Sequence, residues 1–257
     1  MILTVDIGNT NIVVGGIEGD KTFFIERLST IRTKTELEYA IDFKLLMDIH
    51  KVKPSDIEGG IISSVVPQIT QIVRIAAEKI LNKEVLVLQA GTKTGLNIKI
   101  DNPAQLGADL VADAVAGIHY YPVPQVIIDM GTATTLSVID DKKQYIGGVI
   151  MPVPVISLDA LTSRASQLSG ISLEAPEHVV GRNTIECMKS GIVYSNAAAL
   201  EGIISRIEDE IGSKVTIVAT GGLSKRIVPY CKRDIILDEE LLLKGLYIIY
   251  MKNQLNH

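Results

Sequence analysis

The feature that most constrains this chain is a short pattern that occurs twice, about half a chain apart. Residues 6–11 read DIGNTN and residues 129–134 read DMGTAT, and each copy follows one apolar run and precedes another. Such an arrangement predicts a β-hairpin whose glycine-containing tip bends tightly and approaches a ligand closely. Backbone N–H groups and side-chain donors at such a tip can hold phosphate oxygens. We interpret the two hairpins as the two halves of one nucleotide clamp; two ordinary hairpins are the alternative.

The composition limits the class of protein. The chain has 257 residues, of which 47% are hydrophobic and 21% charged, so one large domain or two halves with a substantial core are expected. The net charge of −5 argues against nucleic acid or an anionic membrane as a partner but does not argue against ATP. No apolar run is long enough to span a membrane and the start does not resemble a signal peptide. Cys187 and Cys231 have no motif spacing, which indicates reduced thiols in a cytoplasmic protein.

The order of apolar runs and helical periods predicts an α/β protein. The boundary between the halves is expected near residues 115–125, giving an N-terminal half of 1–118 and a C-terminal half of 119–257. In the first predicted helix, the apolar residues near the 3.6-residue period are Leu37, Ala40, Ile41, Leu45, Leu46 and Ile49. Strands are predicted at residues 2–6, 11–17, 21–28, 59–65, 84–88, 126–129, 134–140, 145–150, 215–219 and 235–237. Helices are predicted at residues 35–52, 68–81, 105–119, 156–167, 184–211 and 239–252.

The helix predicted over residues 105–119 has two different faces. Gln105, Asp109 and Asp113 are four residues apart on one face, and the other face carries an apolar stripe. Asp109 follows Gly107 and Ala108, whose small size permits the close approach of a substrate. A positioned carboxylate of this kind can act as a general base. A solvated helix carboxylate is the alternative from the residue alone.

Seven motifs follow one another along the chain: DIGNTN at 6–11, ISSVVP at 62–67, NPAQLGAD at 102–109, DMGTATT at 129–135, GGVIMP at 147–152, GRNT at 181–184 and TGG at 220–222. In this order they resemble the actin-like ATPase fold, to which hexokinase belongs, and within it the type III pantothenate kinase family. The resemblance covers the chain from Met1 to the last predicted helix. It implies duplicated ribonuclease-H-like halves, each with a mixed five-stranded sheet and helices packed against it. It also implies ATP-dependent phosphorylation of pantothenate to 4'-phosphopantothenate, the first step of coenzyme A biosynthesis.

The resemblance assigns the residues of the nucleotide site. Asp6 would lie close to a cluster of Mg²⁺ and phosphate, and Asp129 would bind a monovalent cation, potassium or ammonium. A turn at residues 220–222 would approach the adenosine, although an ordinary turn before a helix is the alternative. The expected ATP-binding residues are Asp6, Ile7, Gly8, Asn9, Thr10, Asn11, Ile12, Val13, Gly131, Thr132, Gly221 and Gly222.

The acceptor pocket is where this chain departs from the family pattern. Asp109 is the expected catalytic base, and Thr184 matches a residue that contacts pantothenate, although Thr184 could instead be only a helix cap. The family usually has Arg where this chain has Leu110, Tyr where it has Ile100, and Gly where it has Val153. The expected substrate-binding residues are Ile100, Gly107, Ala108, Asp109, Leu110 and Thr184.

These departures leave three hypotheses open. The chain phosphorylates pantothenate, phosphorylates an acceptor without a carboxylate, or binds nucleotide as a non-catalytic regulatory protein. Arg164 or Arg182 could supply the missing positive charge. A homodimer is also expected, because the helices at 105–119 and after Thr184 carry much apolar surface, Ile185 and Val193 included, and because family members pair through the second half.

Overall fold

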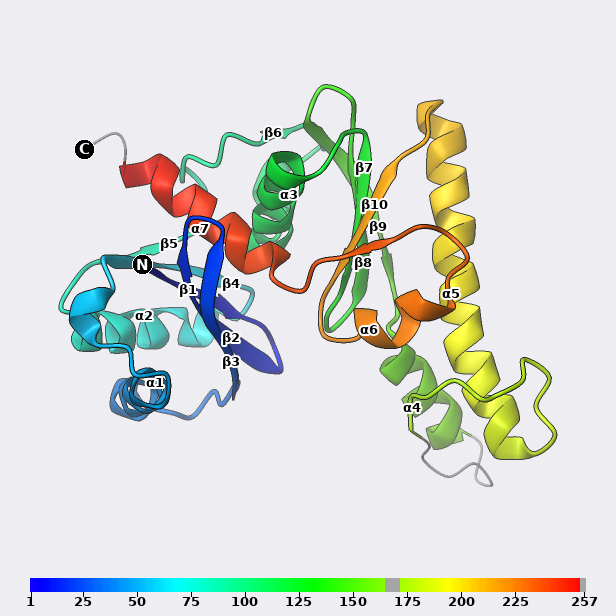
Figure 1. The fold of residues 1–257 in the computed structure, drawn as a ribbon, viewed down its shortest axis with the longest axis horizontal. Helices are drawn as coiled ribbons and strands as arrows, with labels where there is room; N and C mark the ends of the chain where they lie inside the picture. The colour runs from blue at the N-terminus through cyan, green and yellow to red at the C-terminus, as the bar shows by residue number, and fades with distance from the viewer. Residues whose placement is uncertain (165–171, 255–257) are drawn as a thin grey trace. The chain divides into compact units, whose positions relative to one another are not determined.

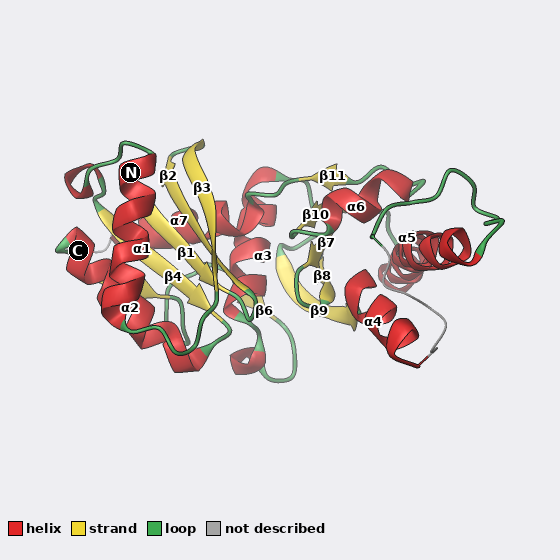
Figure 2. Ribbon diagram, turned by 90° about the horizontal axis from the view of Figure 1, so that it is seen from below, coloured by secondary structure: helices red, strands yellow, loops and turns green. Residues whose placement is uncertain are grey.

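The computed structural model describes residues 1–164 and 172–254 of the chain, which form two compact units. Unit 1 consists of Met1–Tyr120 and Glu240–His257, and unit 2 consists of Tyr121–Glu239. Each unit has a mixed β-sheet with helices packed against it (Figure 1, Figure 2). This confirms the α/β class.

The sheet of unit 1 has the strand order β3-β2-β1-β4-β5. The first three strands along the chain form an antiparallel meander. Strand β4 pairs parallel to β1, and β5 pairs parallel to β4. Strands β1 and β4 are almost wholly buried, because helices cover both faces of the sheet. The strands are β1 (Ile2–Ile7), β2 (Asn11–Glu18), β3 (Lys21–Ser29), β4 (Gly59–Ser64) and β5 (Val85–Val87).

Two pairs of helices enclose this sheet. Helices α1 (Glu36–Ile49) and α2 (Pro67–Leu81) pack against each other over one face, and α3 (Ala108–Tyr120) and α7 (Leu241–Gln254) pack against each other over the opposite face (Figure 1). The first turn of α1 is closed by a capping box, in which Glu38 N donates to Thr35 Oγ1 at 3.4 Å and Thr35 N donates to Glu38 Oε2 at 2.7 Å. Each pair of helices covers its own hydrophobic cluster.

The buried face of α1 differs from the apolar face expected from the sequence. Tyr39, Phe43 and Met47, four residues apart, are fully buried, together with Ala40 and Leu46. The remaining expected positions are solvent-exposed: Leu37, Ile41, Leu45 and Ile49. Two apolar stripes share this helix, and the aromatic one provides the larger side chains for the core.

The sheet of unit 2 repeats the topology of unit 1. Three strands form an antiparallel meander, β10 and β11 follow in parallel, and the order of the strands of unit 2 is β11-β10-β7-β8-β9. These five strands match the expected number, and a further strand of two residues, β6 (Asn97–Ile98), belongs to the chain segment of unit 1. The strands of unit 2 are β7 (Gln125–Met130), β8 (Thr134–Ile139), β9 (Gln144–Met151), β10 (Thr216–Thr220) and β11 (Ile236–Leu237).

One long helix, α5 (Thr184–Ile211), provides much of the core of unit 2. Its residues Val193, Ala197, Leu200 and Ile204 pack with apolar residues of β7, β8 and β10. The other helices of this unit are α4 (Pro154–Arg164) and α6 (Ser224–Ile227). Helix α4 was expected at residues 156–167, of which 165–167 lie outside the described residues.

The closing helix belongs to unit 1, although it was expected in the C-terminal half. The chain passes between the units at Tyr120 and Tyr121, two residues after the expected boundary, and returns at Glu240. Leu246 and Ile249 of α7 belong to the same hydrophobic cluster as Ile2 of β1 and Ile61 of β4. A Cβ atom at Gly245 would lie 1.9 Å from the carbonyl oxygen of Ala112, so only glycine permits the close approach of α3 and α7.

Candidate active site

The turn between β1 and β2 is the first predicted phosphate turn. Ile7 and Ile12 pair across its base and are fully buried, whereas Asn9, Thr10 and Asn11 are exposed. The turn is closed by a hydrogen bond of 3.0 Å that Gly8 N donates to Asn11 O. A Cβ atom at Gly8 would lie 3.1 Å from the same oxygen. Among the predicted residues, Ile7 and Ile12 therefore hold the turn in place, and its polar tip faces solvent.

Residues after β3 support this turn, and sequence reasoning missed them. Thr30 Oγ1 donates to Gly8 O at 2.7 Å, and Thr30 N donates to Thr10 O at 3.0 Å. Arg32 Nη2 donates to Asn9 Oδ1 at 3.3 Å, which brings an exposed guanidinium to the tip. These residues follow a strand at a position where no motif marks them, so only the pairing of β2 with β3 reveals them.

Asp6 lies at the C-terminal end of β1, where the parallel strand β4 also ends. It is partly buried and pairs in register with Val13 of β2 and Ser63 of β4. The Ser63 hydroxyl is buried and has no hydrogen-bond partner among the residues that the structure describes. Ligands of open α/β sheets bind outside the carboxyl ends of parallel strands. A carboxylate and a hydroxyl there fit a hard cation such as Mg²⁺.

The turn between β7 and β8 is the second predicted phosphate turn. Gly131 N donates to Ala133 O at 3.1 Å, and Gly131 and Thr132 are exposed. Asp129 pairs in register with Thr135 of β8 and Thr220 of β10, which places the three side chains on one face of the sheet. The Thr135 Oγ1 atom is buried and has no hydrogen-bond partner within the described part of the chain. These oxygen atoms fit a cation better than an anion.

The turn at residues 220–222 packs directly on Asp129 and Met130. Gly221 has a φ of +86°, and a Cβ atom there would lie 2.4 Å from Asp129 Oδ1 and 2.6 Å from the backbone N and C atoms of Met130. Leu223 N donates to Met130 O at 3.2 Å, which ties the end of this turn to the same strand. Gly221 is therefore required for contact with the carboxylate, while Gly222 is exposed.

Asp109 occupies the first turn of α3, not the second turn expected from a helix beginning at Gln105. Residues Pro103–Gln105 form a separate 3₁₀ turn and Leu106 is extended, so α3 begins at Ala108. Asp109 Oδ1 accepts a hydrogen bond of 2.8 Å from Leu110 N. Burial raises the pKa of the Asp109 carboxyl, against the opposing effect of backbone N–H donors. A raised pKa suits a group that must accept a proton near neutral pH.

Gly107 allows the Asp109 carboxylate to take this position. A Cβ atom at Gly107 would lie 2.3 Å from Asp109 Oδ1, so even alanine would displace the oxygen. Asp113, expected on the same polar face, is fully buried. Residues Ala108 and Leu106 are partly buried and pack against the unit 1 core, whereas Leu110 is partly buried but not part of the described core clusters. Leu110 is therefore available to line a pocket.

The predicted acceptor residue Thr184 is the first residue of α5, and it is exposed. The N-cap is Asn183, whose Oδ1 accepts from Glu186 N at 3.0 Å, so the expectation that Thr184 could be the cap is wrong. Arg182 N donates to Glu186 Oε2 at 2.8 Å. A Cβ atom at Gly181 would lie 2.4 Å from Cys187 N. The GRNT motif thus closes the helix start and leaves the Thr184 side chain facing solvent.

Two of the remaining departures from the family pattern differ in exposure. Ile100 is partly buried in the loop that precedes α3, whereas Val153 is 3% exposed. Val153 O accepts a hydrogen bond of 3.2 Å from Ser157 N at the start of α4. Ile100 can therefore face a ligand, and Val153 has a structural role. The side chain of Arg164 lies outside the described residues.

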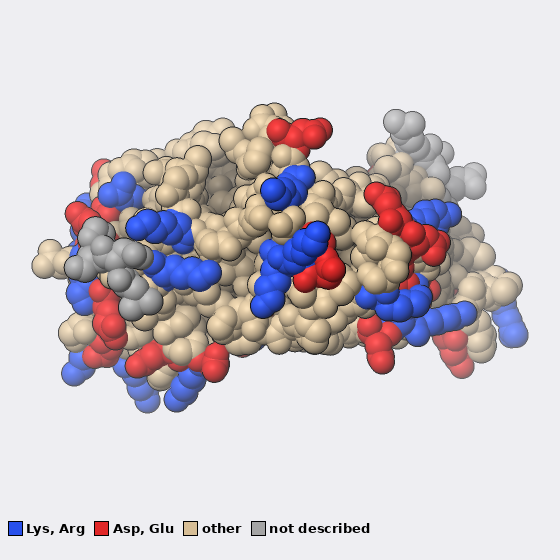
Figure 3. All heavy atoms as spheres, turned by 90° about the horizontal axis from the view of Figure 1, so that it is seen from above, with Lys and Arg blue, Asp and Glu red and all other residues tan. Residues whose placement is uncertain are grey.

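The described residues limit the other kinds of site. They contain no group of three or more His, Cys, Asp or Glu side chains that could hold a metal ion. None of the helices they form is both long and apolar enough to cross a bilayer. On the face shown in Figure 3, acidic and basic side chains are intermixed and no continuous basic stripe is visible. A nucleic-acid interface would need such a stripe.

Known proteins resemble this chain in sequence and in fold. A model of the type III pantothenate kinase family matches residues 2–206. The type III pantothenate kinase of Exiguobacterium sp. is 43% identical over 254 residues, which are 99% of this chain and 100% of the relative.

Two solved structures share the fold at low sequence identity. The activator of 2-hydroxyisocaproyl-CoA dehydratase from Clostridium difficile, solved with bound ADPNP, has a TM-score of 0.60 at 13% identity and covers 99% of this chain and 96% of its own. The ROK hexokinase of Thermus thermophilus has a TM-score of 0.51 at 11% identity and covers 98% of this chain and 99% of its own. The expectation of the duplicated actin-like fold is thereby confirmed.

Proposed function

Because this chain belongs to the type III pantothenate kinase family, we propose that it transfers the γ-phosphoryl group of ATP to pantothenate with Asp109 as the general base. Enzymes of this family are phosphotransferases that act at the first step of coenzyme A biosynthesis, and this chain is one of them. The observation that carries the assignment of the base is the Asp109 carboxyl, which is held in the first turn of α3, is partly buried and has a raised pKa. In the mechanism, this carboxylate accepts the proton of the acceptor hydroxyl as the oxygen attacks phosphorus.

The test is Asp109→Asn in a coupled assay of ADP release with Mg²⁺, potassium and pantothenate. We expect turnover to fall by at least about 100-fold, since a positioned base contributes roughly 10²–10⁴ in rate. ATP affinity, measured by calorimetry, should stay within a few-fold. The matched control is Asp101→Asn, which changes an exposed carboxylate shortly before α3. Turnover of Asp109→Asn close to that of the control would remove Asp109 as the base.

Each unit provides one turn that is suited to phosphate oxygens. The exposed backbone N–H groups and side chains at residues 9–11 and 131–132 donate to phosphate oxygens, and Arg32 adds a positive charge at the first turn. Asp6 is the candidate carboxylate in unit 1 that would hold Mg²⁺, which would neutralise charge on the phosphates. This arrangement leaves little covalent chemistry for the protein, because positioning and charge neutralisation carry phosphoryl transfer.

We assign the monovalent cation, potassium or ammonium, to Asp129. The support is the oxygen-rich face formed by Asp129, Thr135 and Thr220, together with the buried Thr135 hydroxyl that has no partner among the described residues. A weakly charged set of ligands of this kind suits a singly charged ion. When bound, the cation supplies positive charge beside the second phosphate turn.

In unit 1, Ile100, Ala108 and Leu110 are assigned to the acceptor pocket around Asp109. In unit 2, the exposed Thr184 hydroxyl is the candidate for acceptor binding. Since Leu110 is outside the described core clusters, Leu110→Arg should lower the KM for pantothenate about tenfold or more, as a charge-assisted hydrogen bond contributes roughly 1.5–3 kcal/mol. The melting temperature should change little. A lowered melting temperature with an unchanged KM would show that the substrate carboxylate is bound elsewhere. ADP release with a neutral alcohol such as pantetheine, but not with pantothenate, would favour the changed acceptor.

The protein forms a homodimer through unit 2. The support is a group of apolar side chains exposed near the start of α5 and on α4: Val155, Ile156, Leu161, Val179, Val180 and Ile185. Two of the apolar surfaces expected from the sequence are not available for pairing, because Val193 is 1% exposed and α3 is buried over most of its surface. Light scattering of wild type and Ile185→Asp tests the assignment, and a monomeric wild type at micromolar concentration would contradict it.

A further inference from the structure

The hydroxyl of Tyr39 holds the segment that links β3 to α1. Tyr39 Oη accepts a hydrogen bond of 3.1 Å from Ile31 N and donates one of 2.9 Å to Ile31 O. Tyr39 is fully buried, whereas Ile31 is 40% exposed. One phenol oxygen thus fixes both backbone groups of a single exposed residue. Phenylalanine would fill the core equally well, so the hydroxyl has a separate role in holding this backbone.

Ile31 begins a β-turn whose two ends are attached to α1. Lys34 N donates to Ile31 O at 3.2 Å, which places Arg32 at the first central position of the turn. The Lys34 ammonium forms an ion pair of 2.6 Å with Asp42 Oδ2 and lies 5.5 Å from the centre of the Tyr39 ring. Tyr39 therefore holds the first residue of the β-turn directly and contacts the side chain of its last residue.

The residue that Tyr39 holds lies between two residues that contact the turn between β1 and β2. Thr30 immediately precedes Ile31 and Arg32 immediately follows it, and both donate hydrogen bonds to residues 8–10. Thr30 donates two, of 2.7 Å from its hydroxyl and 3.0 Å from its backbone N–H, and Arg32 donates one of 3.3 Å. The backbone position of Ile31 thus sets where both neighbours meet the first phosphate turn.

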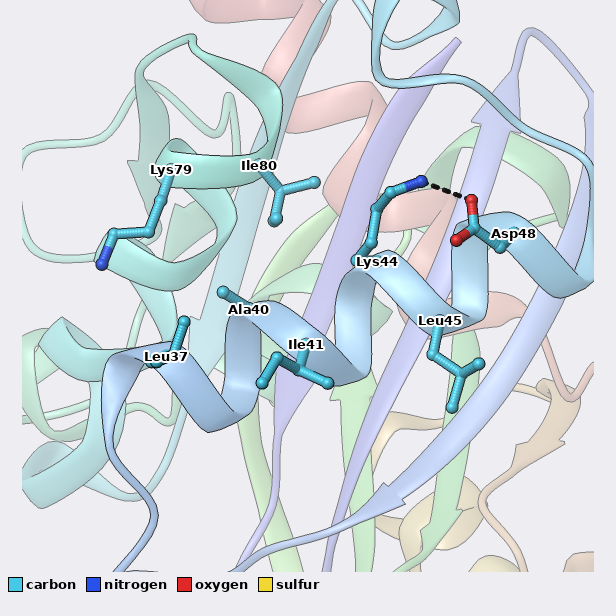
Figure 4. A pocket seen from close by; sticks show the side chains of 8 residues that line it. All are labelled: Leu37, Ala40, Ile41, Lys44, Leu45, Asp48, Lys79 and Ile80. Atoms are coloured by element: carbon cyan, nitrogen blue, oxygen red, sulfur yellow. Dashed lines mark hydrogen bonds and ion pairs between the residues drawn. The ribbon is translucent and has the colours of Figure 1, made fainter.

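Helix α1 provides a fixed support for this contact. Tyr39, Phe43 and Met47 lie in the hydrophobic core of unit 1. Figure 4 draws side chains from the solvent-exposed side of the same helix, among them Leu45 and Asp48. A side chain whose rotamer is locked by packing can hold a functional group accurately. The core therefore fixes the Tyr39 ring, and the ring fixes the exposed loop.

We propose that Tyr39 is a positioning residue for the first phosphate turn. By holding Ile31, its hydroxyl keeps Thr30 and Arg32 in place and orients the exposed donors at residues 9–11 for phosphate oxygens. This role rests on the proposed function, in which that turn binds the phosphates of ATP. A turn that is already held in its binding conformation loses less entropy when ATP binds, so the affinity is higher.

The first variant is Tyr39→Phe, which removes the hydroxyl and keeps the ring in the core. Hydrogen exchange of the peptide that contains residues 6–11, measured by mass spectrometry on the free protein, should become about two- to tenfold faster, as expected for the loss of one net hydrogen bond. The Kd for ATP with Mg²⁺ and no acceptor, measured by calorimetry, should rise about threefold, because only part of an exposed charged contact is lost.

The matched control is Tyr250→Phe in the same unit. Tyr250 is a buried tyrosine of α7 whose hydroxyl lies beside Gly59, the first residue of β4. Gly59 pairs in register with Ile2, at the end of β1 that is remote from the phosphate turn. Exchange at residues 6–11 and the Kd for ATP should both equal those of wild type in this variant.

Two further variants separate positioning from a general loss of stability. In Thr30→Val, which removes the hydroxyl that donates to the turn, the addition of Tyr39→Phe should change the Kd for ATP less than it does in wild type, because both act through one contact. Asp42→Ala releases the Lys34 end of the β-turn and makes the net charge less negative, which alone would favour ATP. It should nevertheless speed exchange at residues 6–11.

The outcomes distinguish this role from the proposed function. If wild type binds ATP and Tyr39→Phe changes neither exchange nor Kd, the positioning role alone is overturned. Equal changes in Tyr250→Phe, or full additivity with Thr30→Val, would assign the effect to core packing and overturn it as well. Faster exchange in Tyr39→Phe with an unchanged Kd would remove the first turn from the nucleotide site, and that part of the proposed function would fail.

Discussion

The β1–β2 turn of unit 1 and the β7–β8 turn of unit 2 occupy equivalent places in two sheets of the same topology, yet they differ in construction. The first spans four residues between Ile7 and Ile12, and the second spans three between Met130 and Thr134. The first is supported by Thr30 and carries an arginine at its tip. The second is supported by a glycine turn packed on its carboxylate.

This difference shows how a duplicated hairpin can take two roles. Amide donors and a guanidinium at the first turn suit an anion, whereas carboxylate and hydroxyl oxygens at the second suit a cation. The pairing of β1, β2 and β3 and that of β7, β8 and β9 provide the same framework in both units. The chemistry of each turn is determined by residues outside its hairpin. These residues follow β3 in unit 1 and β10 in unit 2.

The largest expected effect comes from removing the glycine support of unit 2. In Gly221→Ala, the added Cβ atom meets Asp129 and Met130, and the positive φ adds strain of about 1–3 kcal/mol. We expect a lower melting temperature and near-complete loss of ADP release. The control is Gly191→Ala in α5, where a Cβ atom would meet nothing within 4 Å. Equal stability of the two variants would contradict the contact between the turns.

The next effect concerns the cation that distinguishes the second turn. In Asp129→Asn, loss of the charged ligand should weaken potassium binding roughly tenfold or more, since a hydrogen bond or contact to a charged group is worth about 1.5–3 kcal/mol. Two measurements apply: activation by potassium relative to sodium, and the rise in melting temperature with each salt at equal ionic strength. Asp141→Asn, an exposed carboxylate in the β8–β9 turn, is the control. Identical behaviour of wild type in the two salts would refute a specific site.

A smaller effect is expected from the arginine that distinguishes the first turn. Arg32→Gln should raise the KM for ATP about fivefold with little change in kcat, because an exposed charged contact contributes up to about 1 kcal/mol. The control is Arg27→Gln on β3, which removes the same charge at another exposed position. If both variants shift KM equally, the effect is one of net charge and Arg32 has no specific contact.

The smallest effect concerns stability and pH at Asp109 of unit 1. Because burial raises the pKa of Asp109 in the folded state, the folded protein binds this proton more tightly than the unfolded chain. The stability that this proton provides is lost as pH rises from the normal range of Asp through the raised value. Asp109→Asn should therefore melt at a slightly higher temperature than wild type at pH 7, with no advantage at low pH.

Activity should show the complementary dependence. Turnover of wild type should fall as pH decreases through the raised pKa of Asp109, since the protonated carboxyl cannot accept the proton of the acceptor. Equal melting curves of wild type and Asp109→Asn at all pH values would indicate that the carboxylate is well solvated.

Much of the fold was predictable from local patterns, and the start of α3 is an exception. The hairpins at Asp6 and Asp129, and the long helix from Thr184 to Ile211, depend on alternation, glycine turns and helix capping, which act within a few residues. The start of α3 was missed because the 3₁₀ turn at Pro103 and the extended Leu106 separate Gln105 from the helix. That shift moves Asp109 into the first turn.

By itself, the sequence determined the duplication, the two glycine turns and the carboxylate that ends each central strand, because these are properties of adjacent residues. Only the tertiary structure decided which of two apolar stripes of α1 faces the core, that α7 returns to unit 1, and that Arg32 reaches Asn9. Each of these depends on packing between segments far apart in the chain. A pattern of apolar residues shows that a face can be buried, but the surface that buries it is selected by the shape and volume of the whole core.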